Sequence, residues 1–251
     1  MPDRFPPRFT RTVDLFGADG FAGIRRGGAV VVGLGGVGAH AVVALARAGI
    51  GRLKLIDNDR VTTSSLNRHP VAGPADVGRL KTEILAAWIG RTCPDTRVEA
   101  QAAWVDQDNL DELVDPTERE LFPVLIDCID SVPSKVALVS HGARHGWITL
   151  CSLGAAGKRE GGLLRAGDLF DSRVCPLAKK VRQGARRLGV APGQVHAVWS
   201  VEEPRPPVTA PRGEHLPDEP GVTRRQPSSI MVPGMVGFAL AAAAVDALAR
   251  K

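Results

Sequence analysis

A glycine-rich turn joins an apolar strand-like run to an apolar helix-like run within residues 30–59, VVVGLGGVGAHAVVALARAGIGRLKLIDND. Gly33, Gly35 and Gly38 fit the pattern G-x-G-x-x-G, in which bare backbone N–H groups and a helix N-terminus meet phosphate oxygens. Asp57 follows the next strand-like run, at the distance where an acid binds ribose hydroxyls in doubly wound folds. The stretch therefore predicts a nucleotide site, and it leaves NAD and ATP both open.

The rest of the chain continues the rhythm of a mostly parallel, doubly wound α/β sheet. The expected strands are residues 29–32, 52–56, 97–102, 124–128 and 148–152, and the expected helices are residues 37–48, 76–89, 108–114 and 133–145. The length of 251 residues suits one domain of this class. We expect an N-terminal arm over 1–28, a nucleotide-binding core over 29–155 and a substrate-side region over 156–251.

Two segments near the C-terminus lack this rhythm. Residues 204–227 hold seven prolines and no apolar periodicity, so we expect a flexible crossover loop and neither a strand nor a helix. Residues 230–251 are apolar but contain Pro233 and Asp246 and barely reach spanning length, which favours a buried or dimer-facing helix over a membrane span. The N-terminus does not resemble a signal peptide, and we expect a cytoplasmic protein.

The four cysteines, Cys93, Cys128, Cys151 and Cys175, lie far apart and include no C-x-x-C pair. This spacing argues against a structural zinc and against a disulfide framework, so we expect no zinc. The net charge of +5 is compatible with a polyanionic partner but does not require one.

Two cations follow Asp57 in a stretch for which a redox enzyme has no use. Arg68 lies in SLNRH and Lys81 lies in VGRLK, and a nucleoside triphosphate needs such cations to offset its own charge and that of the departing pyrophosphate. The stretch LIDCIDSVPSK then ends a strand on Asp127 and Asp130, where an acid can hold Mg²⁺. Asp127 taken alone is better explained as a structural acid. The set favours ATP over NAD.

In order and spacing, GLGGVG, LIDND, SLNRH, VGRLK and DCIDS resemble the ubiquitin-activating-enzyme-like adenylating superfamily over roughly residues 8–155. The remainder, with DLFDSRVCPLAKKVRQGARRLGV and VWSVEEP, most resembles the branch of tRNA threonylcarbamoyladenosine dehydratases. The resemblance implies ATP and Mg²⁺ as cofactors and tRNA as the substrate. ATP would convert a threonine-derived carboxylate into an acyl adenylate, and the substrate's own ureido nitrogen would close the ring without an enzyme nucleophile.

The resemblance also assigns roles to single residues. The nucleotide would be bound by Gly33, Gly35, Gly36, Gly38, Asp57, Asp59, Ser65 and Ser131. The catalytic residues would be Arg68, Lys81, Asp130 and Arg11. Asp130 would bind Mg²⁺, and Arg11 would reach the phosphates from a partner subunit, which implies a homodimer. The alternative interpretation is that Arg11 is a surface residue in an N-terminal helix. The chain departs from the family at Ser65, usually asparagine, and at His69, usually glutamine.

A basic amphipathic stretch, CPLAKKVRQGARRLGV, occupies residues 175–190 and places Leu177, Val181 and Leu188 on one side of a predicted helix. The cations that would contact tRNA phosphates are Lys179, Lys180, Arg182, Arg186 and Arg187. A solvated helix face is the alternative interpretation.

Three other functions stay open at this point. An adenylyltransferase for a sulfur-carrier or ubiquitin-like protein would share the ATP site, but the chain lacks zinc and thiol machinery for it. An NAD-dependent oxidoreductase is disfavoured by Arg68 and Lys81. A noncatalytic nucleotide-binding adaptor is supported only by Ser65 and His69. A sulfurtransferase-type protein partner is neither indicated nor excluded.

Overall fold

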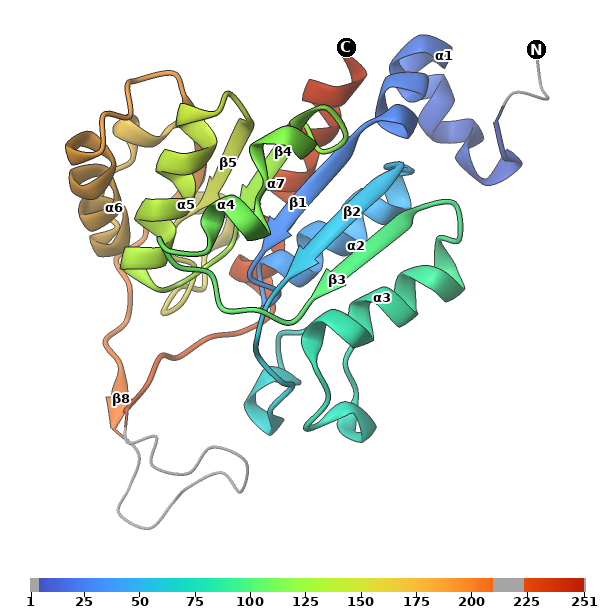
Figure 1. The fold of residues 1–251 in the computed structure, drawn as a ribbon. Coiled ribbons are helices and arrows are strands. Elements are labelled where there is room, and N and C mark those ends of the chain that lie inside the picture. Colours follow the sequence, from blue (N-terminus) through green and yellow to red (C-terminus); the bar gives the residue numbers. More distant parts are fainter. Residues whose placement is uncertain (1–4, 210–223, 251) are drawn as a thin grey trace.

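A seven-stranded sheet forms the centre of the protein in the computed structural model, which describes residues 5–209 and 224–250 (Figure 1). The strands are Gly28–Val32 (β1), Arg52–Ile56 (β2), Arg97–Gln101 (β3), Val124–Asp127 (β4), Ile148–Ser152 (β5), Leu164–Asp168 (β6) and Val195–Ser200 (β7). Their order is β3-β2-β1-β4-β5-β7-β6, and only the edge strand β6 pairs antiparallel. The predicted doubly wound, mostly parallel α/β fold is confirmed.

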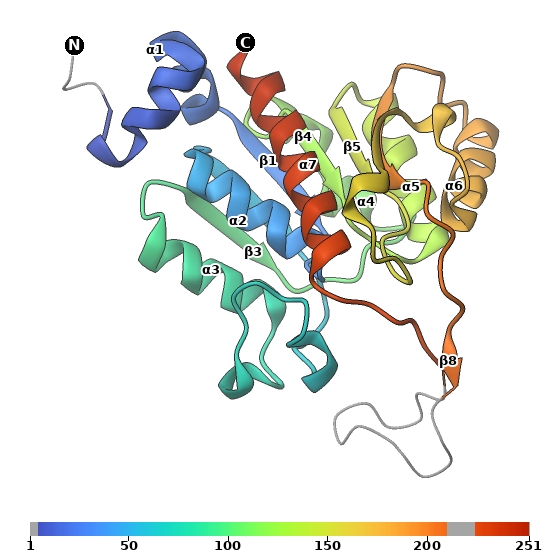
Figure 2. The ribbon, with the colours of Figure 1, turned by 180° about the vertical axis from the view of Figure 1, so that it is seen from behind.

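Helices cover both faces of this sheet (Figures 1 and 2). They are Thr10–Arg26 (α1), Gly38–Ala48 (α2), Lys81–Thr92 (α3), Leu110–Leu113 (α4), Val132–Arg144 (α5), Pro176–Arg187 (α6) and Met231–Ala249 (α7). One core cluster packs α2, α3 and α7 on one face, and two further clusters pack α4, α5 and α6 on the other. Parallel strands covered on both faces must be apolar throughout, which is why β1 reads GAVVV and is buried along its whole length.

Helix α7 is the only helix among the described residues that is long and apolar enough to cross a membrane by length and composition. Core helices of globular proteins have the same length and composition. Here Val236, Leu240 and Ala244 are buried in the core that α7 shares with α2. Met231 and Phe238 leave 64% and 50% of their surface exposed. The helix therefore has one core face, as expected, and one apolar outer face.

The segment 204–227 differs from the expected loop at both of its ends. Val208–Thr209 (β8) and Arg224–Arg225 (β9) pair as a short antiparallel ribbon, so the expectation that no strand forms in this segment was wrong. Backbone hydrogen bonds close such a ribbon without apolar periodicity, whereas the expectation of a loop rested on the seven prolines and on the missing periodicity. Residues 210–223 lie outside the described residues, and the expectation of a flexible loop there stays a prediction.

The basic helix forms as expected, but with a different buried stripe. Ala178, Val181 and Ala185 of α6 are buried, whereas Leu188 is 47% exposed and does not join Val181 on one side. The helix ends at Arg187 and Leu188 is its C-cap, so the helical period no longer governs where Leu188 points.

Candidate functional site

A cavity of about 310 Å³ lies at the carboxyl ends of the central strands. The chain leaves β1 for β2 on one side and returns to β4 on the other, so the sheet has its topological switch point between β1 and β4. Doubly wound sheets bind ligands at this point because the loops separate there and leave a crevice. The lining residues come from the segments 33–37, 57–59, 103–105, 128–130 and 152–156, with Arg68, Lys81, Ser134, Leu177, Ser228 and Pro233.

The glycine turn forms one wall of the cavity. Gly33 has φ +87°, and a Cβ there would lie 2.7 Å from the carbonyl carbon and oxygen of Cys128. A Cβ on Gly38 would lie 1.8 Å from the Gly33 oxygen, so Gly38 is required for the close packing of the turn and does not line the cavity. Gly35 and Gly36 do line it, and a Cβ on Gly35 would meet nothing within 4 Å. The open side of the turn thus faces the crevice.

Asp57 lies beside this turn, at the end of β2. Its Oδ2 accepts a hydrogen bond from the Leu34 amide at 2.5 Å, and its Oδ1 accepts one from the Asp59 amide at 2.7 Å. Burial raises the pKa of Asp57, while the Lys81 ammonium and the two amide bonds lower it. The carboxylate is therefore fixed against the turn, and each oxygen keeps a lone pair for a ribose hydroxyl.

Lys81 is the first residue of α3 and lines the cavity opposite the glycine turn. Only 7% of it is exposed, and its Nζ donates to Asp59 Oδ2 at 2.6 Å. The side chain of Asp59 is 58% exposed, so this carboxylate stays solvated when Lys81 moves to a new partner. The pair holds the ammonium at the cavity wall, beside a carboxylate that water can solvate.

Arg68 and Ser65 occupy one turn, but only Arg68 lines the cavity. The Arg68 amide donates to the Ser65 carbonyl at 3.0 Å, and the guanidinium donates to the Ser64 carbonyl. The Ser65 hydroxyl is buried and bonds the hydroxyl of Thr62 at 2.9 Å. In this structure Ser65 stabilises the turn that carries Arg68 and does not face the cavity itself.

Next to this turn, His69 is buried as a neutral imidazole. Its Nδ1 accepts a hydrogen bond from the Ala72 amide at 3.1 Å, and burial is the main reason why the pKa of His69 falls to about 4. His69 is absent from the cavity lining, so this departure from the family changes the support behind Arg68 and not the cavity surface.

The two acids after β4 have different surroundings. Asp127 is fully buried and pairs with Lys135 at 2.7 Å, as expected for a structural acid. Asp130 is exposed in the cavity, and its carboxylate has no hydrogen-bond or ion-pair partner among the described residues. Ser131 is the N-cap of α5, while Ser134, one turn later, lines the cavity in its place.

One cysteine, Cys128, lines the cavity. Burial, followed by the Asp127 carboxylate, raises the pKa of the Cys128 thiol to about 12. The thiol is therefore protonated at neutral pH and is a poor nucleophile.

Several lining residues were missed by the sequence analysis, among them Trp104, Ser134, Ser152, Leu177 and Ser228. Trp104 is 51% exposed at the cavity wall, between β3 and α4. Nothing in its sequence context marks it, although an exposed tryptophan shortly after a strand end is a reasonable candidate for contact with a flat ring.

The remaining predicted residues lie away from the cavity. Arg11 is exposed near the start of α1, and α1 lies beyond the amino end of β1, opposite the crevice (Figure 1). The cations predicted to contact tRNA also lie outside the cavity lining, in α6. In α6, Lys179, Lys180, Arg186 and Arg187 are exposed, but the Arg182 guanidinium donates to the backbone and hydroxyl oxygens of Ser172 at 2.6 and 2.7 Å. Arg182 is thus engaged within the protein.

The model of the ThiF family matches residues 9–159, and the chain belongs to this family. Among curated relatives, the tRNA threonylcarbamoyladenosine dehydratase of Escherichia coli K12 is 34% identical over 183 residues, which are 73% of this chain and 67% of that protein. The dehydratase of Haemophilus influenzae is 30% identical over 74% of this chain and 69% of that protein. Dehydratase 2 of Saccharomyces cerevisiae is 33% identical over 77% of this chain, but the match spans only 43% of the yeast protein.

The solved structures that are similar to this chain include a dehydratase of the same kind. The E. coli dehydratase TcdA in complex with ATP has a TM-score of 0.83 and 29% identity, covering 98% of this chain and 95% of that one. Its complex with AMP has a TM-score of 0.81. The resemblance inferred from the sequence motifs, to the adenylating superfamily and to its dehydratase branch, is confirmed.

Proposed function

We propose that this protein is an ATP-dependent, ligase-type enzyme that cyclises N6-threonylcarbamoyladenosine in tRNA by removing one water. The proposal is supported by the dehydratases to which the chain is similar and by the ATP complex of one of them. One observation in this structure carries it furthest. A single cavity at the switch point combines a glycine turn and a ribose-type acid with two cations, and its cysteine is a protonated thiol.

The cavity residues divide the chemistry among them. The glycine turn and Asp57 hold the nucleotide, and the substrate carboxylate attacks the α-phosphorus while pyrophosphate leaves. Arg68 and Lys81 stabilise the negative charge that grows on the phosphates, an effect that is strong in a crevice with little water. The ureido group of the substrate then attacks the activated carbonyl, and AMP leaves. Because the attack is intramolecular, orientation within the cavity supplies much of the rate.

The donor set at the cavity also suits Mg²⁺, which prefers oxygen ligands and is often held by one or two carboxylates plus phosphates. Asp130 is exposed at the cavity with its carboxylate unengaged, and Asp59 is the other exposed acid there. Asp130 would hold the ion. When bound, Mg²⁺ neutralises phosphate charge and so supports the departure of pyrophosphate.

The proposal is tested by incubating the protein with ATP, Mg²⁺ and tRNA that carries the open modification. Mass spectrometry of the digested nucleosides should show loss of one water from that nucleoside, with one AMP formed per product. Omitting ATP is the matched control. Hydrolysis of ATP with an unchanged nucleoside would contradict the proposal. Adenylation of a sulfur-carrier protein, or tight binding of NAD in place of ATP, would favour the corresponding alternative.

We also propose that α6 contacts tRNA and that the protein works in the cytoplasm. Leu177, at the start of α6, lines the cavity, so this helix runs outward from the reaction site. A second hollow of about 410 Å³ between α5 and α6 includes Lys180 and Arg187. Cations along such a path can hold the RNA backbone while one nucleoside enters the cavity.

Charge reversal on this face should weaken tRNA binding without changing ATP binding. The test variant combines Lys179→Glu, Lys180→Glu and Arg187→Glu, whose side chains are exposed. Each phosphate contact that forms releases counterions from the RNA. The slope of log affinity against log salt should therefore become less negative by about one for each contact that is lost. The control is Arg91→Glu with Arg97→Glu, two exposed cations near the opposite sheet edge. Equal affinity and salt slope in both variants would make α6 only a solvated face.

A homodimer with shared active sites is the last part of the proposal. The outer face of α7, with Met231, Met235 and Phe238, and Leu15 of α1 present exposed apolar surface that suits a second copy of the chain. Arg11 lies away from its own cavity, which fits the role implied by the family resemblance, in which this arginine acts in the partner's site.

Two inactive variants should then complement each other. Arg11→Ala and Lys81→Ala homodimers should each lose most of their turnover, whereas a mixed dimer contains one site with both residues intact. Co-expression with two affinity tags and purification of the doubly tagged dimer should restore about half of the wild-type activity per dimer. A mixed dimer as inactive as its parents would contradict shared sites, and a fully active Arg11→Ala homodimer would remove Arg11 from the mechanism.

A further inference from the structure

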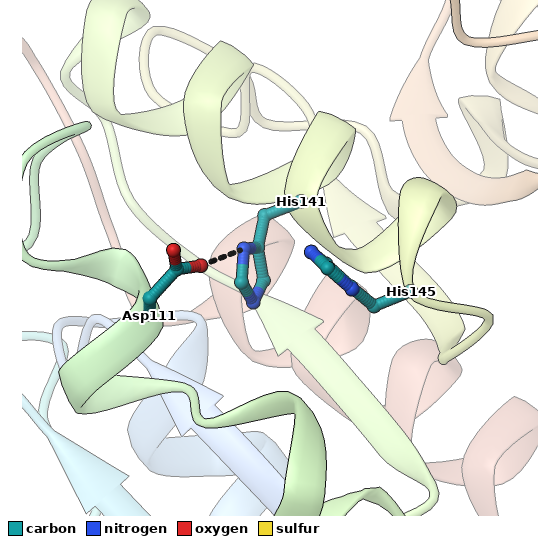
Figure 3. Close-up of side chains that lie close together, drawn as sticks. All are labelled: Asp111, His141 and His145. Carbon is teal, nitrogen blue, oxygen red and sulfur yellow. Dashed lines mark ion pairs between the residues drawn. The ribbon is translucent and has the colours of Figure 1, made fainter.

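Three metal-ligating side chains gather on the face of the sheet covered by α4 and α5, outside the nucleotide cavity. Asp111 lies in α4, His141 lies in the last turn of α5, and His145 is the residue that caps α5 (Figure 3). One donor atom from each lies within 4.8 Å of the other two. None of the three lines the nucleotide cavity.

The hydrogen bonds of His141 determine which of its nitrogens is free. Its Nε2 lies 2.8 Å from the carbonyl oxygen of Val114, and only a protonated Nε2 can bond a carbonyl. In the neutral ring the Nδ1 is then unprotonated and carries a lone pair. Histidines that bind metals commonly have this arrangement, with one nitrogen on the metal and the other donating to a backbone carbonyl.

The Nδ1 of His141 faces Asp111 Oδ1 at 3.4 Å. In the neutral tautomer both atoms are hydrogen-bond acceptors, so neither can satisfy the other directly. A metal ion bound to both atoms would satisfy their lone pairs at once.

The spacing also suits a tetrahedral ion. Ligands at 2.0–2.1 Å from Zn²⁺ lie roughly 3.4 Å from one another, which is the separation of His141 Nδ1 from Asp111 Oδ1. His141 and His145 are four residues apart and so lie on the same side of the helix end. Their rings pack in a tilted arrangement, with 4.6 Å between centroids and 49° between planes, and His141 also lies 5.4 Å from the Trp147 ring. Ring packing alone would explain the positions of the rings, but it does not explain two facing acceptors.

We propose that Asp111, His141 and His145 bind one divalent metal ion, that this ion is Zn²⁺, and that water occupies the fourth coordination position. Two imidazoles and one carboxylate are a ligand set that Zn²⁺ favours. This proposal departs from the expectation of no zinc, which followed from the spacing of the cysteines and did not weigh the spacing H-x-x-x-H in HGARH.

Such an ion would connect α4 to the end of α5. The segment before α4 carries Trp104 at the nucleotide cavity, and the Asn109 side chain donates to the Trp104 carbonyl at 2.7 Å. Holding α4 in place therefore steadies one wall of the cavity. The role inferred for the ion is structural, since it touches no residue that lines the reaction site.

The test uses the full chain, stripped with a chelator and titrated with Zn²⁺ alone under reducing conditions. We expect uptake of one Zn²⁺ per chain by elemental analysis, with a higher unfolding temperature. His145→Gln and Asp111→Asn should each lower Zn²⁺ affinity by at least about tenfold and abolish the temperature shift. Glu112→Gln and His196→Gln are the matched controls, an exposed acid beside Asp111 and a histidine remote from the cluster, and both should bind like the wild type.

Circular dichroism establishes that each variant is folded. The two ligand variants change different residues, so a folding defect in one of them leaves the test by the other intact. Co²⁺ in place of Zn²⁺ should give the visible absorption of a four-coordinate site in the wild type and lose it in His145→Gln. Equal Zn²⁺ affinity in the wild type and both ligand variants would overturn the proposal, because the ion would then be bound elsewhere. Failure of the wild type to take up Zn²⁺ would overturn it as well.

Discussion

Replacing Lys135 with methionine should lower the free energy of unfolding by about 3–5 kcal/mol. Lys135 and Asp127 are both fully buried, and the ammonium donates to Asp127 Oδ2 at 2.7 Å and to the Ser152 carbonyl at 2.8 Å. Methionine fills the space of the lysine stem but leaves the Asp127 carboxylate without its counterion. The cost arises because a charge then stays in a low-dielectric interior. Urea unfolding at neutral pH measures it.

Lys54→Met is the matched control for this experiment. Lys54 is also buried, but its partner Glu118 has a side chain that is 32% exposed, and water can solvate it after the lysine is lost. The loss should therefore be smaller than in Lys135→Met. Adding Asp127→Leu to Lys135→Met should recover part of the stability, since no buried charge remains. A Lys135→Met variant as stable as the control would show that Asp127 is neutral or hydrated in the folded protein.

Lys81→Ala should lower turnover about 10²–10³-fold while leaving the fold nearly unchanged. The lysine lies at the cavity, where no other ammonium lines the wall among the described residues. Its resting partner Asp59 is 58% exposed, so the loss of this pair leaves that carboxylate solvated by water. The same residue type thus has opposite expected effects at positions 81 and 135, because the partner carboxylate is solvated in one case and buried in the other.

Single-turnover assays with saturating ATP separate this effect from weaker binding. Lys54→Ala serves as the control, because it removes a buried lysine from an ion pair away from the cavity. Its turnover should equal that of the wild type at a temperature where both are folded. If Lys81→Ala kept wild-type turnover, Lys81 would be a structural partner of Asp59 and nothing more.

Much of the central fold could be predicted from local pattern. The five expected parallel strands appear as β1 to β5. Four of them, β1, β2, β4 and β5, are short and largely buried apolar runs bounded by turns, whereas the edge strand β3 reads RVEAQ and is mostly exposed. Strand β7, which reads VHAVWS and is largely buried, was not predicted, and the edge strand β6 was not predicted either. Its sequence LRAGD has no apolar run, since one side of an edge strand is left to solvent and its pairing with β7 is a matter of backbone hydrogen bonds. Helix α1 was missed because Gly17 interrupts it with φ +74°.

In the candidate site, too, some residues could be predicted from local sequence and others could not. The motifs around Gly33, Asp57, Arg68 and Lys81 were found because each is local, with the residue type and the chain punctuation together in a few positions. Ser65 and Trp104 show where such reasoning stops. Ser65 belongs to the SLNRH motif but bonds Thr62, whereas Trp104 belongs to no motif and lines the cavity. Which side chain points into a crevice depends on neighbours that are distant in sequence.

The sequence by itself determined the class of fold, the nucleotide chemistry and the family, because these depend on the order and spacing of short motifs along one chain. Only the tertiary structure decided the partners of the charged side chains. It placed Lys135 on Asp127 and Lys81 on Asp59, and it brought Asp111 to within 3.4 Å of His141 across thirty positions of the chain. The physical reason is that burial and electrostatic pairing are set by distances in space, which residue order constrains only within a helix turn or a strand.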